Sequence, residues 1–312
     1  MPPPTPDDRV EALAARAAAG EDLSREDAAA LCAGDPLALG GIADGLRRSL
    51  HGNRAYLVRI HIVGWGDEVP AAVDADEVRI EGPLPEGATA ADLRATLRRA
   101  SAARAPVRAR RPAEVPALAR AAGLTGRVLL ARLADAGLAT LAHPGAGDDP
   151  AATREGLLAA HGAGLATDAP LPYGARTAPE ALADLLLGIR ALPGAADRFR
   201  CAVPLPDSTP EQSPLTGTTG LQDLRVVACA RILLPPPIRV AVEAGPLGAR
   251  LAAVALSFGA DTLAGALAAP TVRPTPATAD LPRPFDADRA RRLLAEAGRE
   301  PVLPPPFPAR DA

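Results

Sequence analysis

The sequence predicts an α/β fold, a TIM-type (β/α) barrel with a truncated first β/α unit and an N-terminal helical extension. Three observations support this. Short β-rich runs alternate with helical stretches over residues 53–300, which is typical of a parallel sheet covered by helices. A length of 312 residues suits one barrel domain. Only about a dozen residues separate the first two expected strands, which leaves scarcely enough chain for a crossover with a helix.

The expected domain organisation has four parts. Residues 1–8 form a disordered lead-in, residues 9–52 the helical extension, residues 53–300 the barrel, and residues 301–312 a proline-rich tail that lies along the surface or is mobile. In the extension, an alanine-rich helix covers Val10–Ala19. Ser24 caps a second helix that runs to Leu31, and helical spacing of apolar residues predicts a third over Leu37–Leu50.

The barrel elements follow from the alternation of β-rich and helical runs. The expected strands are Ala55–Val63, Glu77–Glu81, Val107–Arg110, Leu138–Leu141, Leu165–Pro170, Phe199–Val203 and Ile238–Val242. The expected helices are Ala90–Ala102, Glu114–Ala122, Gly126–Ala136, Thr153–Gly162, Pro179–Ala191, Leu221–Leu233 and Leu247–Phe258.

Composition excludes several function classes. The net charge of −3 comes without a basic stripe, so no nucleic-acid partner is expected. No apolar run reaches the roughly 20 residues that span a bilayer, and the first residues do not resemble a signal peptide, so a cytoplasmic protein without a membrane partner is expected. The chain has no lysine, which excludes a Schiff base and a P-loop lysine. Cys32, Cys201 and Cys229 are widely spaced and are expected to be buried thiols in a reducing compartment.

Several segments, in order along the chain, resemble a known enzyme family. They are Leu23–Asp27, Ile42–Arg47, Tyr56–Ile62, Glu77–Gly82, Leu133–Leu138, Ala160–Leu165, Tyr173-Gly174, Val203–Pro206, Thr219–Arg225 and Leu256–Asp261. Together they resemble the radical S-adenosylmethionine (SAM) enzymes aminofutalosine synthase, dehypoxanthine futalosine cyclase and the second-half enzyme of deazaflavin (FO) synthesis. The resemblance covers about residues 20–300, and it implies a β/α barrel and a link to futalosine-type menaquinone synthesis.

The chain departs from this family where its chemistry resides. The resemblance implies a C-x-x-x-C-x-x-C loop after the first strand, whose three thiolates hold a [4Fe–4S] cluster. Residues 64–76 contain no cysteine. The family's glycine pair after the second strand is Gly82-Pro83 here, and its acidic residue after the fourth strand is displaced to Asp148. No cofactor is therefore expected, the cluster is predicted to be absent, and SAM binding is left open.

Six residues at expected strand ends are candidate ligand-binding residues at the barrel mouth: His61, Glu81, Gly82, His143, Asp148 and Tyr173. Tyr173 either contacts a nucleoside-like ligand or belongs to the core. No catalytic residue and no metal site is predicted.

Two further arrangements among the polar residues stay open. His61 with Asp67 and Glu68 could form a metal site or a plain polar loop. His143 with Asp148 and Asp149 could form an acid–base set, or an aspartate could start the helix near Pro150.

The remaining polar candidates have structural interpretations. His161 is expected to be structural within a helix, and Asp223 and Arg225 are expected to form a capped, solvated first turn.

Three hypotheses follow for function. The first is a pseudoenzyme that serves as a partner of an intact radical SAM paralogue or binds a nucleoside-like small molecule. The second is an enzyme of another class with a polar or metal site at the barrel mouth. The third is a sensor of SAM or a nucleoside. Fold alone does not choose among them.

Overall fold

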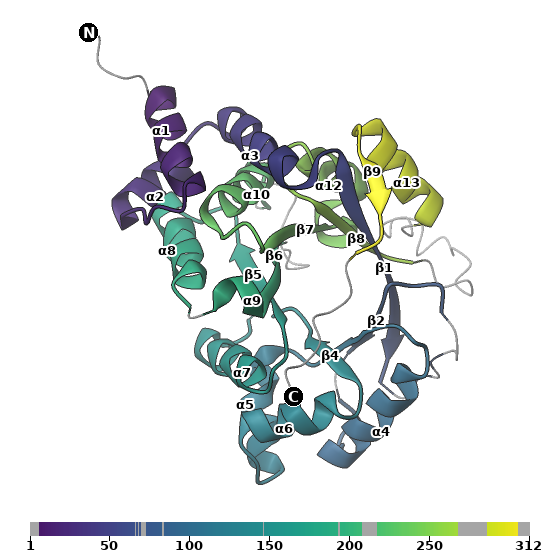
Figure 1. Cartoon of the computed structure of the whole chain (residues 1–312). Helices are drawn as coiled ribbons and strands as arrows, with labels where there is room; N and C mark the ends of the chain where they lie inside the picture. Colours follow the sequence, from purple (N-terminus) through teal and green to yellow (C-terminus); the bar gives the residue numbers. More distant parts are fainter. Residues whose placement is uncertain are drawn as a thin grey trace. The chain divides into compact units, whose positions relative to one another are not determined.

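A computed structural model describes residues 6–65, 67, 69, 73–82, 84–145, 147–192, 194–207, 217–267 and 286–304. The strands lie in one sheet with the order β4-β3-β2-β1-β8-β7-β6-β5, and β9 pairs with β1. All strand pairs with a defined register are parallel. This sequential order, with helices between the strands, confirms the predicted TIM-type (β/α) barrel (Figure 1).

The elements are numbered along the chain. The strands are β1 (Arg54–Gly64), β2 (Glu77–Glu81), β3 (Val107–Ala109), β4 (Leu138–Leu141), β5 (Thr167–Tyr173), β6 (Phe199–Pro206), β7 (Arg239–Glu243), β8 (Thr262–Ala266) and β9 (Glu300–Val302). The helices are α1 (Pro6–Ala18), α2 (Arg25–Cys32), α3 (Pro36–His51), α4 (Ala90–Ser101), η1 (Pro112–Glu114), α5 (Val115–Ala121), α6 (Gly126–Ala134), α7 (Pro150–Gly162), α8 (Pro179–Arg190), α9 (Ala195–Arg198), α10 (Gly220–Leu233), α11 (Ala244–Leu247), α12 (Ala249–Ala255) and α13 (Ala287–Glu296).

The chain divides into two compact units. The first contains Met1–Leu57, Ala169–Ala264 and Asp288–Leu303; the second contains Val58–Asp168, Gly265–Ala287 and Pro304–Ala312. In the first unit the extension helices pack on barrel helices, α3 against α10 and α2 against α8. Ser24 caps α2 through the backbone N–H of Asp27, as the sequence predicts.

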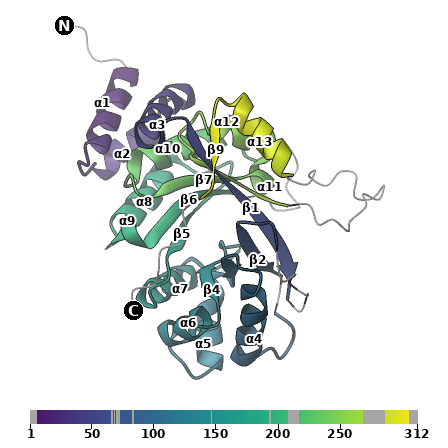
Figure 2. The same cartoon turned by 45° about the vertical axis from the view of Figure 1, so that its right-hand side comes forward.

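The second unit contains most of β1, all of β2–β4, and helices α4–α7 (Figure 2). One face of these strands packs against the helices. It carries Val78, Ile80 and Val107, which share a hydrophobic core with Leu97 of α4 and Leu130 of α6. The intervening residues Glu77, Arg79 and Arg108 therefore project from the opposite face of these strands, because side chains alternate along a strand.

The connection between β1 and β2 is short. None of the described residues among 65–76 is helical, in keeping with the predicted truncation of the first β/α unit. The turn begins where Asp67 accepts a hydrogen bond from the N–H of Gly64 at 2.8 Å.

Two glycines permit close backbone approaches in this unit. Gly137, before β4, has φ +110°, and a Cβ there would meet the Ser101 hydroxyl of α4. A Cβ at Gly156 of α7 would lie 2.0 Å from the carbonyl oxygen of Pro112. Larger residues at these positions would separate the packed elements.

Several sequence expectations need correction. β8 was not predicted, because three of its five residues, Ala264, Gly265 and Ala266, are types that are depleted in strands. The single helix expected over Leu247–Phe258 is two helices, broken at Gly248 with φ +78°. α9 and α13 were also not predicted.

The chain termini also differ from expectation. The tail beginning at Pro301 contributes to β9, which pairs with Arg54–Tyr56 of β1, and residues 305–312 lie outside the described part. At the other end α1 begins at Pro6, four residues before the expected start, and residues 1–5 lie outside the described part. No described helix combines the length and apolarity needed to cross a bilayer.

Candidate ligand-binding site

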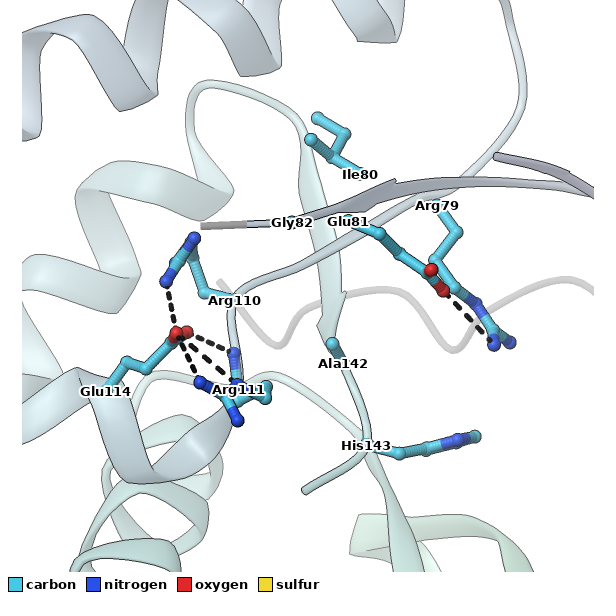
Figure 3. Close-up of a pocket in the computed structure, with 9 residues that line it drawn as sticks. All are labelled: Arg79, Ile80, Glu81, Gly82, Arg110, Arg111, Glu114, Ala142 and His143. Atoms are coloured by element: carbon cyan, nitrogen blue, oxygen red, sulfur yellow. Dashed lines mark hydrogen bonds and ion pairs between the residues drawn. The ribbon is translucent and has the colours of Figure 1, made fainter. Parts of the chain in front are cut away.

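A pocket of about 430 Å³ opens in the second unit where β2, β3 and β4 end. Figure 3 shows its lining residues. They are Arg79, Ile80, Glu81, Gly82, Arg110, Arg111, Glu114, Ala142 and His143. Most of them lie at or just after the carboxyl ends of three parallel strands, where (β/α) barrels place their ligand sites. The volume lies within the usual range for small-molecule sites.

A buried ion cluster lies beside this pocket. The Arg108 guanidinium donates to both carboxylate oxygens of Glu77, at 2.7 and 3.0 Å, and to Asp168 Oδ2 at 2.7 Å. The three side chains are at most 4% exposed. Burial alone would lower the pKa of Arg108, but the charges of Asp168 and Glu77 raise it well above its usual value. Arg108 is therefore a permanent cation between two carboxylates.

His143 and Arg79 join this cluster to the pocket. His143 Nε2 lies 3.1 Å from Asp168 Oδ2, so one carboxylate oxygen is shared by the imidazole and by Arg108. Arg79 contacts Glu77 at 3.3 Å and Glu81 at 3.9 Å. The charges of this side of the pocket are thus largely compensated by one another.

A second cluster forms the facing wall. Glu114 Oε1 lies 2.5 Å from Arg110 Nη2 and 3.1 Å from Arg111 Nη2, and Glu114 Oε2 accepts from the backbone N–H of Arg111 (Figure 3). Arg111 Nη1 also donates to Asp148 at 2.7 Å, and Asp148 accepts from the N–H of Gly145. Two guanidinium groups and two carboxylates therefore balance here.

The pocket brings together three of the six predicted ligand-binding residues. Glu81, Gly82 and His143 line it, and Asp148 reaches it through Arg111. His61 is half-buried on β1 and is not among the lining residues. Tyr173 belongs to the first unit.

Hydrogen bonds identify the helix cap and a partner of His143. Asp149, not Asp148, caps α7 by accepting from the N–H of Ala152. His143 pairs with Asp168, and Asp148 pairs with Arg111, so an acid–base role of His143 stays a hypothesis in which Asp168 is the neighbouring carboxylate. His161 is buried in α7 and bonds to Thr167, in keeping with a structural role. Among the described residues no group of histidine, cysteine and carboxylate side chains is arranged to hold a metal ion; Glu68, part of the open metal hypothesis, lies outside them.

Tyr173 is fully integrated in the first unit. Its hydroxyl donates to Asp223 Oδ1 at 2.8 Å, and both side chains are buried. Burial, followed by the negative charge of Asp223 and the hydrogen bond to it, raises the pKa of Tyr173 well above its usual value. The expectation of a solvated turn at Asp223 is therefore wrong, since the tyrosine takes this carboxylate out of solvent; Arg225 is half-buried.

The arginines are the site residues that sequence reasoning missed. Charged residues alternate with apolar ones in β2 (Glu77–Glu81) and β3 (Val107–Ala109). Arg79 and Arg108 occupy charged positions of this pattern, which is a usable sequence signal for a charged face of the strands. Arg110 and Arg111 directly follow β3, at a barrel position where functional residues are common.

The residues present do not fit the [4Fe–4S] cluster that the resemblance implies. A cluster needs several thiolates at one place, and the β1–β2 connection contains no cysteine. Cys32, Cys201 and Cys229 are buried in α2, β6 and α10 of the first unit. The hydrogen bond to Cys32 and burial raise the pKa of the Cys229 thiol, which favours the protonated form over the ligating thiolate.

Comparisons with known proteins agree with the fold. Methylornithine synthase (PylB) matches with a TM-score of 0.68 and 13% identity over 93% of this chain and 97% of that one. HydG from Carboxydothermus hydrogenoformans, a maturase of the FeFe-hydrogenase, matches with a TM-score of 0.62 and 14% identity over 96% of this chain and 80% of that one. At these identities the likeness shows the fold alone.

Sequence comparison gives a more local similarity. A 5-amino-6-(D-ribitylamino)uracil–L-tyrosine 4-hydroxyphenyl transferase of Methanosarcina barkeri is 33% identical over 120 residues. That match spans 36% of this chain and 31% of the archaeal protein, less than a third of its length. No family model matches the chain.

Proposed function

We propose that this chain is a non-catalytic relative of the aminofutalosine synthase group of radical SAM enzymes. It serves futalosine-type menaquinone synthesis as a ligand-binding subunit or as a partner of an intact paralogue. The single observation that carries this proposal is the β1–β2 connection, which is short and has no thiol where the implied chemistry needs three.

The comparisons support the fold in this proposal. The solved neighbours, methylornithine synthase (PylB) and the FeFe-hydrogenase maturase HydG, have the same barrel. The archaeal transferase shares a stretch of sequence with this chain. The pathway itself rests on the resemblance of the segments described above.

The pocket supports ligand binding over chemistry on SAM. Its walls are formed by arginine–carboxylate pairs that compensate one another, and its volume is about 430 Å³. A barrel with such a pocket can bind a small molecule or offer a surface to a protein partner. Without the cysteine loop that holds a [4Fe–4S] cluster, it cannot by itself supply the electron that cleaves the C–S bond of SAM.

The test is a cleavage assay on the anoxically purified chain with SAM and a strong reductant. We expect no 5′-deoxyadenosine above the level without protein. Release of 5′-deoxyadenosine by the isolated chain would refute the proposal. Co-purification from the native cell with a paralogue that carries the cysteine motif separates the partner role from the ligand role.

One observation favours a second candidate, an enzyme of another class at the same pocket. The His143–Asp168 pair has the geometry of an oriented general base. Asp168 also accepts a hydrogen bond from Arg108, however, and this cation compensates the negative charge that Asp168 presents to the His143 imidazole. Purified protein that contains stoichiometric zinc or manganese would favour this candidate.

A further inference from the structure

We propose that the pocket at the ends of β2–β4 binds the carboxylate or phosphate group of a small molecule through Arg110 and Arg111, and that Glu114 occupies the place of this group in the free protein. This inference rests on the ligand-binding part of the proposed function and names the chemistry of the ligand.

The first argument is that part of the hydrogen-bonding capacity of the Arg110 guanidinium is unsatisfied. Its Nη2 contacts Glu114, while its Nε is buried and has no hydrogen-bond partner among the described residues. The side chain is 5% exposed, so solvent does not replace the missing partner. Nε and Nη2 together form the planar edge that pairs with the two oxygens of a carboxylate or phosphate.

A second unpaired donor belongs to Trp65, which contacts Arg110 but is not among the residues that line the pocket. The Arg110 guanidinium stacks on the Trp65 ring, with 5.1 Å from its carbon Cζ to the ring centroid. Trp65 Nε1 is also buried without a partner in the described part of the chain. Buried donors are usually paired in proteins. Unpaired arginine nitrogens also occur elsewhere among the described residues, but here two unpaired donors lie on stacked side chains, and we take this pairing to mark the place of a missing acceptor.

The backbone at Arg110 is consistent with a site under functional constraint. Arg110 has φ +59°, which costs a non-glycine residue roughly 1–2 kcal/mol. Arg104, exposed in the same unit, has the same φ and provides a natural control.

Glu114 is suited to be exchanged. It is 23% exposed, and its pair with Arg111, which is 42% exposed, contributes little net stability. The contact that a ligand anion must replace is therefore the one between Glu114 and Arg110, which is 5% exposed. Asp148 is 10% exposed and is held by the Gly145 N–H, so it keeps Arg111 in place when Glu114 withdraws. Burial lowers the pKa of Arg110, and the negative charge of Glu114 only partly offsets this effect. An anion that contacts both Nε and Nη2 would stabilise the charged guanidinium further.

The test is isothermal titration calorimetry at low salt with matched probes on the full chain. Adenosine 5′-monophosphate is compared with adenosine, benzoate with benzamide, and inorganic phosphate is titrated alone, each to about 10 mM. We expect binding of at least one charged probe and no binding of its neutral match. The pair that responds distinguishes a phosphate from a carboxylate as the natural group.

Three variants locate the site. Arg110→Gln is expected to weaken binding about ten- to a hundredfold, the value of a charge-assisted hydrogen-bond pair. Arg104→Gln makes the same charge change at the same φ outside the pocket and is expected to leave affinity within about twofold. Glu114→Gln removes the competing anion, keeps an oxygen acceptor and is expected to tighten binding severalfold.

The proposal is overturned if no charged probe binds to the wild-type protein, or if Arg110→Gln binds as well as the wild type. Should Arg110→Gln fail to fold, Glu114→Gln decides: unchanged or weaker binding overturns the proposal, and tighter binding supports it. A chain that lacks iron and binds no oxyanion would contradict this inference alone, while a chain that cleaves SAM would contradict the proposed function whatever it binds.

Discussion

Replacing Arg108 with methionine tests the buried ion cluster directly. The side chain is 3% exposed and donates to Glu77, Asp168 and the Leu141 carbonyl oxygen at 2.7–3.0 Å. Methionine keeps much of the volume but leaves two buried carboxylates without this cation. Removing one partner of a buried pair costs about 3–5 kcal/mol, mainly because the other charge stays buried. A typical domain has only about 5–15 kcal/mol of stability, so the loss should be large.

The assay is urea unfolding followed by the fluorescence of Trp65, which is the only tryptophan and belongs to the unit that contains Arg108. Arg98→Met, at an exposed position of α4, is the matched control and should change stability by less than about 0.5 kcal/mol. Adding Asp168→Asn to Arg108→Met should restore part of the loss, because it removes one uncompensated charge. A cost below about 1 kcal/mol for Arg108→Met would show that the cluster is solvated or differently arranged.

Three further substitutions test other parts of the structure. Tyr173→Phe should cost about 1–3 kcal/mol at neutral pH because Asp223 loses its donor. The pKa of Tyr173 is raised in the folded state, so its contribution to the free energy of unfolding is complete below about pH 10 and is lost as the pH rises further. The variant should therefore lose less stability than the wild type between neutral and alkaline pH. Equal losses in the two proteins would contradict this. Leu130→Ala removes a fully buried side chain of α6 and should cost about 2–5 kcal/mol in urea unfolding, and a cost under about 1 kcal/mol would mean that the core is packed otherwise. Gly137→Ala should destabilise by more than about 1 kcal/mol through its positive φ and the clash with Ser101. Ser101→Ala in the same chain should recover only the part of the clash that comes from the hydroxyl, since the Cβ of residue 101 would still lie 2.9 Å from the added methyl group.

The barrel was predictable because its signals are local. β2 and β4 have the predicted bounds, and α2 starts at its predicted cap, because apolar periodicity and Ser24 capping act over a few residues. β8 and β9 escaped prediction because their residues do not favour strands: Ala and Gly make up three of the five residues of β8, and Pro301 lies within β9. Both strands form through pairing, β8 with β7 and β9 with β1.

The site was only partly predictable for a related reason. Because functional residues of (β/α) barrels lie at strand ends, the sequence predicts Glu81, Gly82 and His143 at the barrel mouth, and these three residues line one pocket. Their role in ligand binding stays a prediction. The partners of these residues could not be deduced, since Arg108 and Asp168 are 60 positions apart and meet only through the fold. Asp223 was assigned to solvent because its position in a first helical turn is usually exposed, and the burial comes from Tyr173, 50 positions away.

The measurement that tests the central claim most directly is the iron and acid-labile sulfide content of the full chain after anoxic reconstitution with ferrous iron and sulfide. The account predicts only background amounts of both after desalting, since all three cysteines are buried, burial and the hydrogen bond to Cys32 favour the protonated thiol at Cys229, and the β1–β2 connection has no thiol. About four irons and four sulfides per chain would contradict it.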